Sequence, residues 1–172
     1  MSFFKKLFEG NKVNQENKKF NLEVLLTSPD INSSIIELDD YIGDLCSYGD
    51  ALEKLTLPQK YFYFNQNLER EVNNGGFSQY FINSSGEFAH ETLTSLRSIG
   101  TNKTASILQD AMAQFPDSLV PKDRAVRQQI VVQIEEVANK AWDELDKQFF
   151  TYEDNLSDLA IHYVKQNKID FK

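Results

Sequence analysis

The stretch EVNNGGFSQYFINSSG, from Glu71 to Gly86, contains the strongest turn signals in the chain. Asparagine and glycine enter positive φ at the lowest cost, so Asn73–Gly76 predicts the end of a helix and a sharp turn. The next segment, Phe77–Asn83, predicts a short helix whose aromatic residues are spaced i, i+3 and i+4 on one apolar face. In the following NSSG turn, either serine can cap a new helix that begins near Glu87. The stretch therefore predicts a corner between helices.

Two interpretations of this corner remain open at the level of sequence. The amides of Asn74, Gln79 and Asn83 can bond the backbone groups that two tight turns leave unpaired, which is an architectural role. Alternatively, these amides converge with Glu69 and Glu71 in a polar pocket, where carboxylates can act as general acids or bases. The sequence shows no second anchored catalytic group beside them, so we predict a non-enzymatic protein without catalytic residues.

Helical periodicity continues outward from the corner almost throughout the chain, without a convincing strand or an internal repeat. The predicted helices are one capped by Ser33 or Ser34, one with Pro58 in its first turn that runs to about Val72, one that stops at Gly100, one from Thr101 or Asn102 to Pro116, one over Asp123–Phe150 and one over Asn155–Gln166. The predicted fold class is therefore all-α, a single-domain helical bundle of about seven to eight helices.

The longest predicted helix lies in the C-terminal half of the chain. Its apolar residues spread over nearly half of its circumference, and they are Val126, Ile130, Ile134, Val137, Ala141, Trp142, Leu145 and Phe149. So wide an apolar stripe is typical of the central helix of a bundle. We therefore expect this long helix at the centre of the fold.

Residues 1–20 differ from the rest of the chain, because they carry five lysines and only two glutamates. We predict an amphipathic stub and a polar linker here, followed by one all-helical domain over residues 21–172. Phe3, Phe4 and Phe8 gather on one side of the stub, so it can bind a membrane surface or a partner. It can also be a terminal tail packed on the domain, and two helical turns bind too weakly alone to favour the first interpretation.

The composition limits the function further. A net charge of −8 and a pI near 4.8 argue against direct nucleic-acid binding, which needs clustered lysine and arginine, but they allow a basic protein partner. No run approaches about eighteen apolar residues and no secretory leader is recognisable, so we predict a cytoplasmic protein that does not span a membrane. The single Cys46 excludes an internal disulfide, and His90 and His162 complete no metal-binding motif. We predict no metal and no cofactor.

The corner and two later segments, ETLTSLRSIG and ILQDAMAQFP, resemble the signature of a bacterial DNA-mimic-protein-like family, a domain of unknown function typified by a neisserial DNA-mimic protein. The resemblance covers Tyr61 to Phe115 firmly and extends more loosely to the final helix. It implies an all-helical protein whose surface charge resembles duplex DNA and which removes a helix-turn-helix transcription factor from its operator. Such mimicry depends on surface carboxylates, so we expect the motif itself to be structural. The motif residues are Asn73, Asn74, Gly75, Gly76, Phe77, Gln79, Tyr80, Phe81, Asn83, Ser84 and Gly86.

Surface carboxylates are concentrated between Lys19 and Lys54, where the chain has no lysine or arginine. The candidate partner-binding residues of this acidic segment are Glu37, Asp39, Asp40, Asp44, Asp50 and Glu53. Glu37, Asp40 and Asp44 lie opposite the apolar positions of one predicted helix, so they predict an exposed row of carboxylates about 5–6 Å apart. The row is either an ordinary solvated helix face or a face that binds a basic partner.

These observations leave three functional hypotheses. The first is a non-enzymatic acidic interaction protein, a DNA mimic that sequesters a DNA-binding protein or transcription factor. The second is an immunity-type neutraliser of a basic toxin or nuclease. The third, from another class, is an enzyme or small-ligand binder that uses the Asn-Gly-Gly corner. The partner predicted by the first two is a basic protein, and a homo-oligomer remains open.

Overall fold

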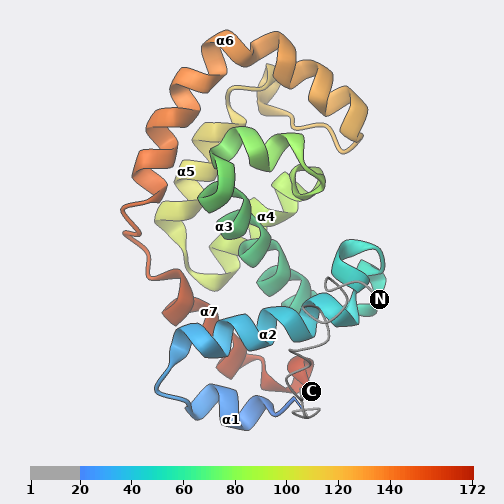
Figure 1. The fold of residues 1–172 in the computed structure, drawn as a ribbon, viewed down its shortest axis with the longest axis vertical. Helices are drawn as coiled ribbons and strands as arrows, with labels where there is room; N and C mark the ends of the chain where they lie inside the picture. The colour runs from blue at the N-terminus through green and yellow to red at the C-terminus, as the bar shows by residue number, and fades with distance from the viewer. Residues whose placement is uncertain (1–19) are drawn as a thin grey trace, which may run out of the picture.

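The computed structural model describes residues 20–172, so the stub predicted over residues 1–20 lies outside the described residues except for Phe20. Over the described range the fold is all-helical and has no strand, as predicted (Figure 1). The α-helices are α1 (Leu22–Thr27), α2 (Ile31–Leu45), α3 (Leu57–Ile82), α4 (Ala89–Ile99), α5 (Asn102–Met112), α6 (Arg124–Phe149) and α7 (Leu156–Gln166). Short 3-10 helices are η2 (Ser47–Gly49), η3 (Leu52–Lys54), η4 (Ser84–Phe88), η5 (Pro116–Ser118) and η6 (Lys168–Phe171).

The start of α2 differs from the prediction. Its cap is Asp30, whose carboxylate accepts hydrogen bonds from the Ser33 backbone N–H at 3.0 Å and the Ser33 hydroxyl at 2.7 Å. A cap at Ser33 or Ser34 is therefore wrong, because the aspartate upstream provides a charged acceptor that extends the helix by a turn. The Ser34 hydroxyl instead donates to the Leu25 carbonyl at 3.0 Å, which joins α2 to α1.

The other helix ends follow local sequence signals. Thr56 and Gln59 form a reciprocal capping box at the start of α3, with Pro58 in the first turn as predicted. Gly100 ends α4 in the left-handed conformation, with φ of 95°, and α5 begins at Asn102. Asp123 and Asn155 cap α6 and α7 with their side chains, which confirms both predicted boundaries to within a residue.

Helix α3 runs through the middle of the fold and connects two hydrophobic clusters (Figure 1). The first half of α3, including Phe62 and Phe64, packs with α1, α2, α7 and η6. The second half, including Val72 and Phe81, packs with α4, α5 and α6. Because one helix contributes to both clusters, the acidic segment before α3 and the corner near its end belong to one structure.

The long helix of the C-terminal half is confirmed, but its buried stripe is narrower than predicted. Trp142 is buried as expected, and its indole N–H donates to the Ala111 carbonyl at 3.0 Å. In contrast, Val137 is 75% exposed and Val126 is also exposed, so the apolar stripe is not covered over its whole width, and the expectation that this helix is central is wrong. The helix lies along one side of the fold in Figure 1, and α3 occupies the middle. None of the helices within residues 20–172 is long and apolar enough to cross a bilayer.

Candidate functional site

The predicted corner is a break in α3 at Gly75 and Gly76. Gly76 has φ of 71° and ψ of −173°, a conformation that only glycine adopts at low cost. A Cβ atom on Gly76 would overlap the carboxylate of Asp146 from α6. That carboxylate accepts a hydrogen bond from the Phe77 N–H at 2.9 Å, so it caps the part of α3 that restarts after the break. Burial raises the pKa of Asp146, and the bond from Phe77 opposes this shift.

The carboxylate of Glu71 organises the second turn of the corner. Its Oε2 accepts hydrogen bonds from the side-chain amides of Gln79 and Asn83, both at 2.8 Å, and its Oε1 accepts from the Ser85 hydroxyl at 3.2 Å. One carboxylate thus connects the helix before the break to the turn after it. Three donors engage both of its oxygens, which is the arrangement expected of a structural group.

The predicted capping role of the serines is wrong. The helix after the corner begins at Ala89, and the residue at its cap position, Phe88, makes no side-chain cap bond. A 3-10 helix precedes it, so Ser84 and Ser85 lie too far upstream to reach the first free N–H groups of α4. Ser85 bonds Glu71 instead, and Ser84 is exposed.

A fully buried arginine holds the end of α3, and the sequence pattern did not identify it. The guanidinium of Arg127 donates to four backbone carbonyls, those of Phe81 at 2.7 Å, Asn83 at 2.9 Å, Pro121 at 2.8 Å and Lys122 at 2.9 Å. These bonds satisfy carbonyls that a helix end and a loop leave without partners. Burial lowers the pKa of Arg127. The side chain therefore joins α6 to the corner through hydrogen bonds and packing.

The remaining motif residues also have structural positions. Phe77, Tyr80 and Phe81 are buried in the cluster that contains Trp142. The Tyr80 hydroxyl donates to Thr92 Oγ1 at 3.0 Å, and burial raises the pKa of Tyr80. A Cβ atom on Gly86 would lie 2.8 Å from both Arg127 Nε and the Phe81 carbonyl oxygen, so only glycine fits there.

The polar pocket considered at the sequence level does not assemble from all five of its residues. Glu71, Gln79 and Asn83 meet, as described above, but Asn74 is exposed. Glu69 accepts a hydrogen bond from the Tyr152 hydroxyl at 3.2 Å, and Asn73 also bonds that hydroxyl. Burial raises the pKa of Glu69. The two glutamates therefore belong to separate hydrogen-bond networks.

The candidate acidic residues on α2 divide into exposed and engaged groups. The apolar face of α2 is buried as predicted, and Asp40 and Asp44 are exposed on the other side. Asp39 instead pairs with Arg70 of α3, and its side chain is only 18% exposed. Burial raises the pKa of Asp39, and the Arg70 charge opposes this shift. Glu37 is half-buried, so the outward row consists mainly of Asp40 and Asp44.

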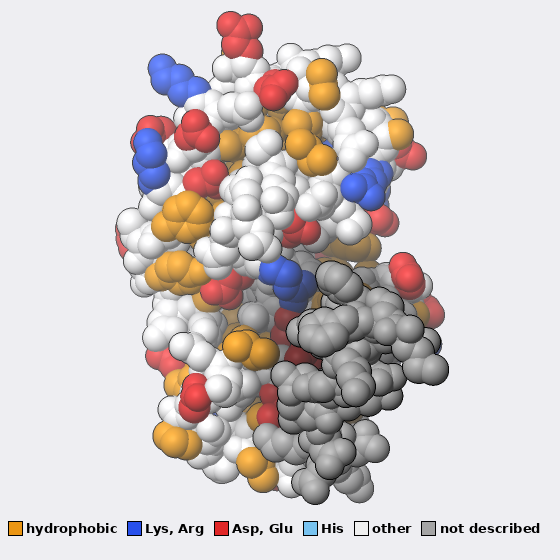
Figure 2. All heavy atoms as spheres, viewed as in Figure 1, with side chains coloured by type: hydrophobic (Ala, Val, Ile, Leu, Met, Phe, Trp, Pro, Cys, Tyr) orange, Lys and Arg blue, Asp and Glu red, His pale blue; other side chains and the backbone are white. Residues whose placement is uncertain are grey.

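The acidic surface continues beyond α2 into the two 3-10 turns. Asp50 and Glu53 are exposed there, and Tyr48 is 65% exposed with φ of 52°. The Tyr48 ring lies against Gly43, where a Cβ atom would be 2.7 Å from the ring. Its hydroxyl donates to Asp44, and this bond raises the pKa of Tyr48. On the face shown in Figure 2, acidic side chains are dispersed among neutral and apolar ones.

The histidines have no ligand-binding geometry in the described part of the chain. His90 Nε2 accepts a hydrogen bond from the Val120 N–H at 3.2 Å, which joins α4 to the loop before α6. No cluster of three potential metal-ligating side chains occurs within residues 20–172. The absence of a metal or cofactor remains a prediction.

Comparison with protein families identifies the class of protein that this fold and corner define. The family described as DMP19-like protein matches residues 53–167, so the chain belongs to the DMP19-like family. This confirms the resemblance inferred from the corner, and the match includes Arg127 and Asp146 as well. Of the candidate acidic residues, only Glu53 falls within it. No curated protein and no solved structure matches the chain.

Proposed function

We propose that this protein is a non-enzymatic, acidic interaction protein of the DNA-mimic type, which occupies the DNA-contacting face of a basic DNA-binding protein. The observation that carries the proposal is the exposure of Asp40, Asp44, Asp50 and Glu53 in a segment without lysine or arginine from residue 20 to residue 53. Exposed carboxylates in a segment that contributes no cation attract a basic surface over about 8–10 Å at physiological salt.

The spacing of the carboxylates supports a comparison with DNA. Asp40 and Asp44 are separated by one helical turn, about 6 Å along the axis of α2. One DNA strand carries a charge every ~3.4 Å of its axis. The protein surface is thus less densely charged than DNA, and it fits a partner that recognises a few phosphates rather than a long continuous groove. A transcription-factor partner also implies a cytoplasmic location.

Family membership and the corner support this choice over an enzyme. Glu71, Gln79, Asn83 and Arg127 are engaged in hydrogen bonds within the corner, which favours a structural role for them over a catalytic one. The immunity-type alternative, a neutraliser of a basic toxin or nuclease, uses the same acidic surface. It differs from the DNA mimic only in the identity of the basic partner.

The test is affinity capture from the native cytoplasm at about 50 mM salt, followed by elution at about 500 mM salt, where surface charges are screened. We expect the full chain to capture a basic protein that duplex DNA also releases. Asp40→Lys with Asp44→Lys should reduce capture about tenfold or more. The matched control is Glu135→Lys with Glu136→Lys, which changes two exposed acids on α6 by the same charge.

The results separate the hypotheses. A captured protein that duplex DNA does not release, and whose toxic or nuclease activity the chain inhibits, would support the neutraliser. Loss of capture with Gln79→Ala, but not with the Asp40 and Asp44 changes, would favour the corner. Capture that both lysine pairs weaken equally would mean that only net charge matters, and failure to capture any basic protein would contradict the proposal.

A further inference from the structure

Two pockets adjoin at the ring of Phe88, between the acidic segment and the corner. The first, here called the apolar pocket, has a volume of about 340 Å³ and includes Leu52, Leu57 and Phe64. The second, here called the acidic pocket, has a volume of about 220 Å³ and includes Tyr48, Asp50, Glu87 and Ser84. Phe88 lines both pockets, so a ligand that crosses its ring can place one group in each.

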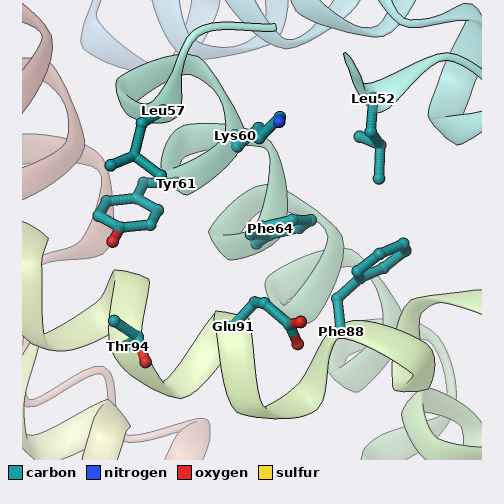
Figure 3. Close-up of a pocket in the computed structure, with 8 residues that line it drawn as sticks. All are labelled: Leu52, Leu57, Lys60, Tyr61, Phe64, Phe88, Glu91 and Thr94. Carbon is teal, nitrogen blue, oxygen red and sulfur yellow. The ribbon is translucent and has the colours of Figure 1, made fainter. Parts of the chain in front are cut away.

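The apolar pocket suits an aliphatic side chain. Figure 3 shows Leu52, Phe64 and Phe88 around one open space, and the rings of Phe64 and Phe88 stack with centroids 5.1 Å apart. Leu57, on the same pocket, is 59% exposed, so a further large apolar side chain is open to a ligand. An occupant here would remove several large apolar groups from water.

The same pocket contains an acceptor without a partner. Glu91 pairs with Lys122 through Oε1, but its Oε2 is buried and accepts no hydrogen bond from any described residue. Because this oxygen is closed to solvent, a ligand N–H group, for example a peptide amide, can bond it only after the Glu91 side chain moves. The ammonium group of Lys60 lies on the other side of the pocket in Figure 3, so a cationic ligand group is disfavoured here.

The acidic pocket has the complementary chemistry. Asp50 and Glu87 are both exposed on its wall. Neither belongs to an ion pair among the described residues, and the charge of the buried Arg127 acts on Glu87 without pairing with it. Beside these two carboxylates, the backbone of Tyr48 has a left-handed conformation, and the next residue, Gly49, also has a positive φ of 113°. Two carboxylates with the faces of Tyr48 and Phe88 form a suitable environment for a guanidinium group.

We infer that the two pockets form one docking site for a short basic and apolar segment of a protein partner. An arginine side chain occupies the acidic pocket, and a leucine-type side chain on the same segment occupies the apolar pocket. Asp50 and Glu87 favour the cation in the acidic pocket, which has no lysine or arginine in its lining, whereas the lining of the apolar pocket includes Lys60. In an extended segment, residues i and i+2 face the same side about 7 Å apart, so they can reach the two sides of the shared Phe88 side chain. The inference rests on the proposed function and locates where a cation of that basic partner binds.

A defined peptide tests the docking site even while the partner is unidentified. The probe is N-acetyl-Arg-Ala-Leu-amide, titrated into the isotope-labelled full chain and followed by backbone amide resonances. We expect saturable shifts at residues 48–50, 52 and 84–91. Replacing the probe arginine with glutamine, or its leucine with alanine, should weaken binding about fivefold or more, because each removes one of the two anchored groups.

Protein variants provide the second measurement. Asp50→Lys with Glu87→Lys should weaken binding of the arginine probe about tenfold and leave the glutamine probe unchanged, whereas Glu135→Lys with Glu136→Lys should affect neither. The inference would be overturned if the arginine and glutamine probes bound the unmodified chain equally, or if the shifts were centred on other residues. Both results come from the unmodified chain, so neither depends on whether a variant folds.

Two further outcomes are distinguishable. Tighter binding of the probe to a chain with Phe4→Ala and Phe8→Ala would identify the chain's own N-terminal segment as the occupant and would overturn the assignment to a partner. Failure of the probe to bind, together with salt-sensitive capture that depends on Asp40 and Asp44, would refute the docking site but leave the proposed function intact. Probe binding without any captured basic protein would contradict the proposed function, on which the partner assignment rests.

Discussion

Gly76 and Gly100 both have positive φ, but they meet different surroundings. Gly100 ends α4 with φ of 95°, and a Cβ atom there would contact nothing within 4 Å. Gly76 combines φ of 71° with an extended ψ, and a Cβ atom would overlap the Asp146 carboxylate that caps the restarted helix. Alanine at Gly100 therefore adds backbone strain alone, whereas alanine at Gly76 adds strain and displaces a cap.

The first prediction compares these two glycines. Gly76→Ala should lower the free energy of unfolding by about 3 kcal/mol or more, and Gly100→Ala should lower it by about 1 kcal/mol. Urea unfolding followed by far-UV circular dichroism measures both. Equal losses would show that the Asp146 contact contributes nothing at the corner.

Arg127 shows how a structural residue can escape prediction from the sequence. Arginine is mostly exposed in proteins, so a helical arginine is assigned to the polar face by default. The sequence does contain one signal of its burial. Arg127 lies four residues before Val131, at a helical spacing that puts it on the same face of α6 as the buried Ala138 and Trp142. The carbonyls that it binds come from a distant turn, and a sequence pattern does not encode which backbone groups lack partners.

At the scale of elements, predictions succeeded where the deciding interaction is local. Pro58, Gly100 and Asp123 act within one turn of the helix end that they define, so the sequence contains all the required information. Predictions failed at the serines of the corner, because Glu71 binds Ser85 from 14 positions earlier in the chain. A distant contact also engages one of the candidate acidic residues, since Arg70 of another helix pairs with Asp39, whereas the role of the exposed row stays a prediction.

The contact between α3 and the turn after α6 leads to a pH-dependent prediction. Burial raises the pKa of Glu69 above its ordinary value of 4.5 in the folded chain, so the folded state holds this proton more tightly than the unfolded state. The resulting stabilisation is present below pH 4.5 and is lost as the pH rises through the raised pKa. Glu69→Gln does not titrate and can still accept a hydrogen bond from Tyr152.

The expected result is a stability difference that changes with pH. Relative to Glu69→Gln, the unmodified chain should lose free energy of unfolding between about pH 4.5 and neutral pH, measured by urea unfolding at each pH. Glu135→Gln, which changes an exposed glutamate of α6, controls for the loss of one negative charge. A difference that is constant with pH would contradict the raised pKa of Glu69.

At the scale of the whole molecule, α3 makes the two hydrophobic clusters interdependent. Each cluster contains part of the same helix, so the loss of either cluster removes packing from one part of α3 and destabilises the helix that the other cluster also uses. The single tryptophan, Trp142, reports on only one of them. Ile42 of α2 is fully buried in the other.

This arrangement predicts a cooperative response to a distant substitution. Ile42→Ala should lower the free energy of unfolding by about 3 kcal/mol, and the midpoints from Trp142 fluorescence and from far-UV circular dichroism should decrease together. Leu108→Ala, in the tryptophan's own cluster, is the matched control. A fluorescence midpoint that stays fixed while the circular dichroism midpoint falls would mean that the clusters unfold independently.

The bonds of Arg127 also set an order of events during synthesis. The carbonyls of Phe81 and Asn83 accept from a side chain 46 and 44 positions later in the chain. The acidic segment and the corner therefore leave the ribosome before Arg127, the group that completes the corner, leaves it. Until α6 emerges, the carbonyls at the end of α3 lack the donors of Arg127. The corner can therefore complete its fold only after the final third of the chain has begun to emerge.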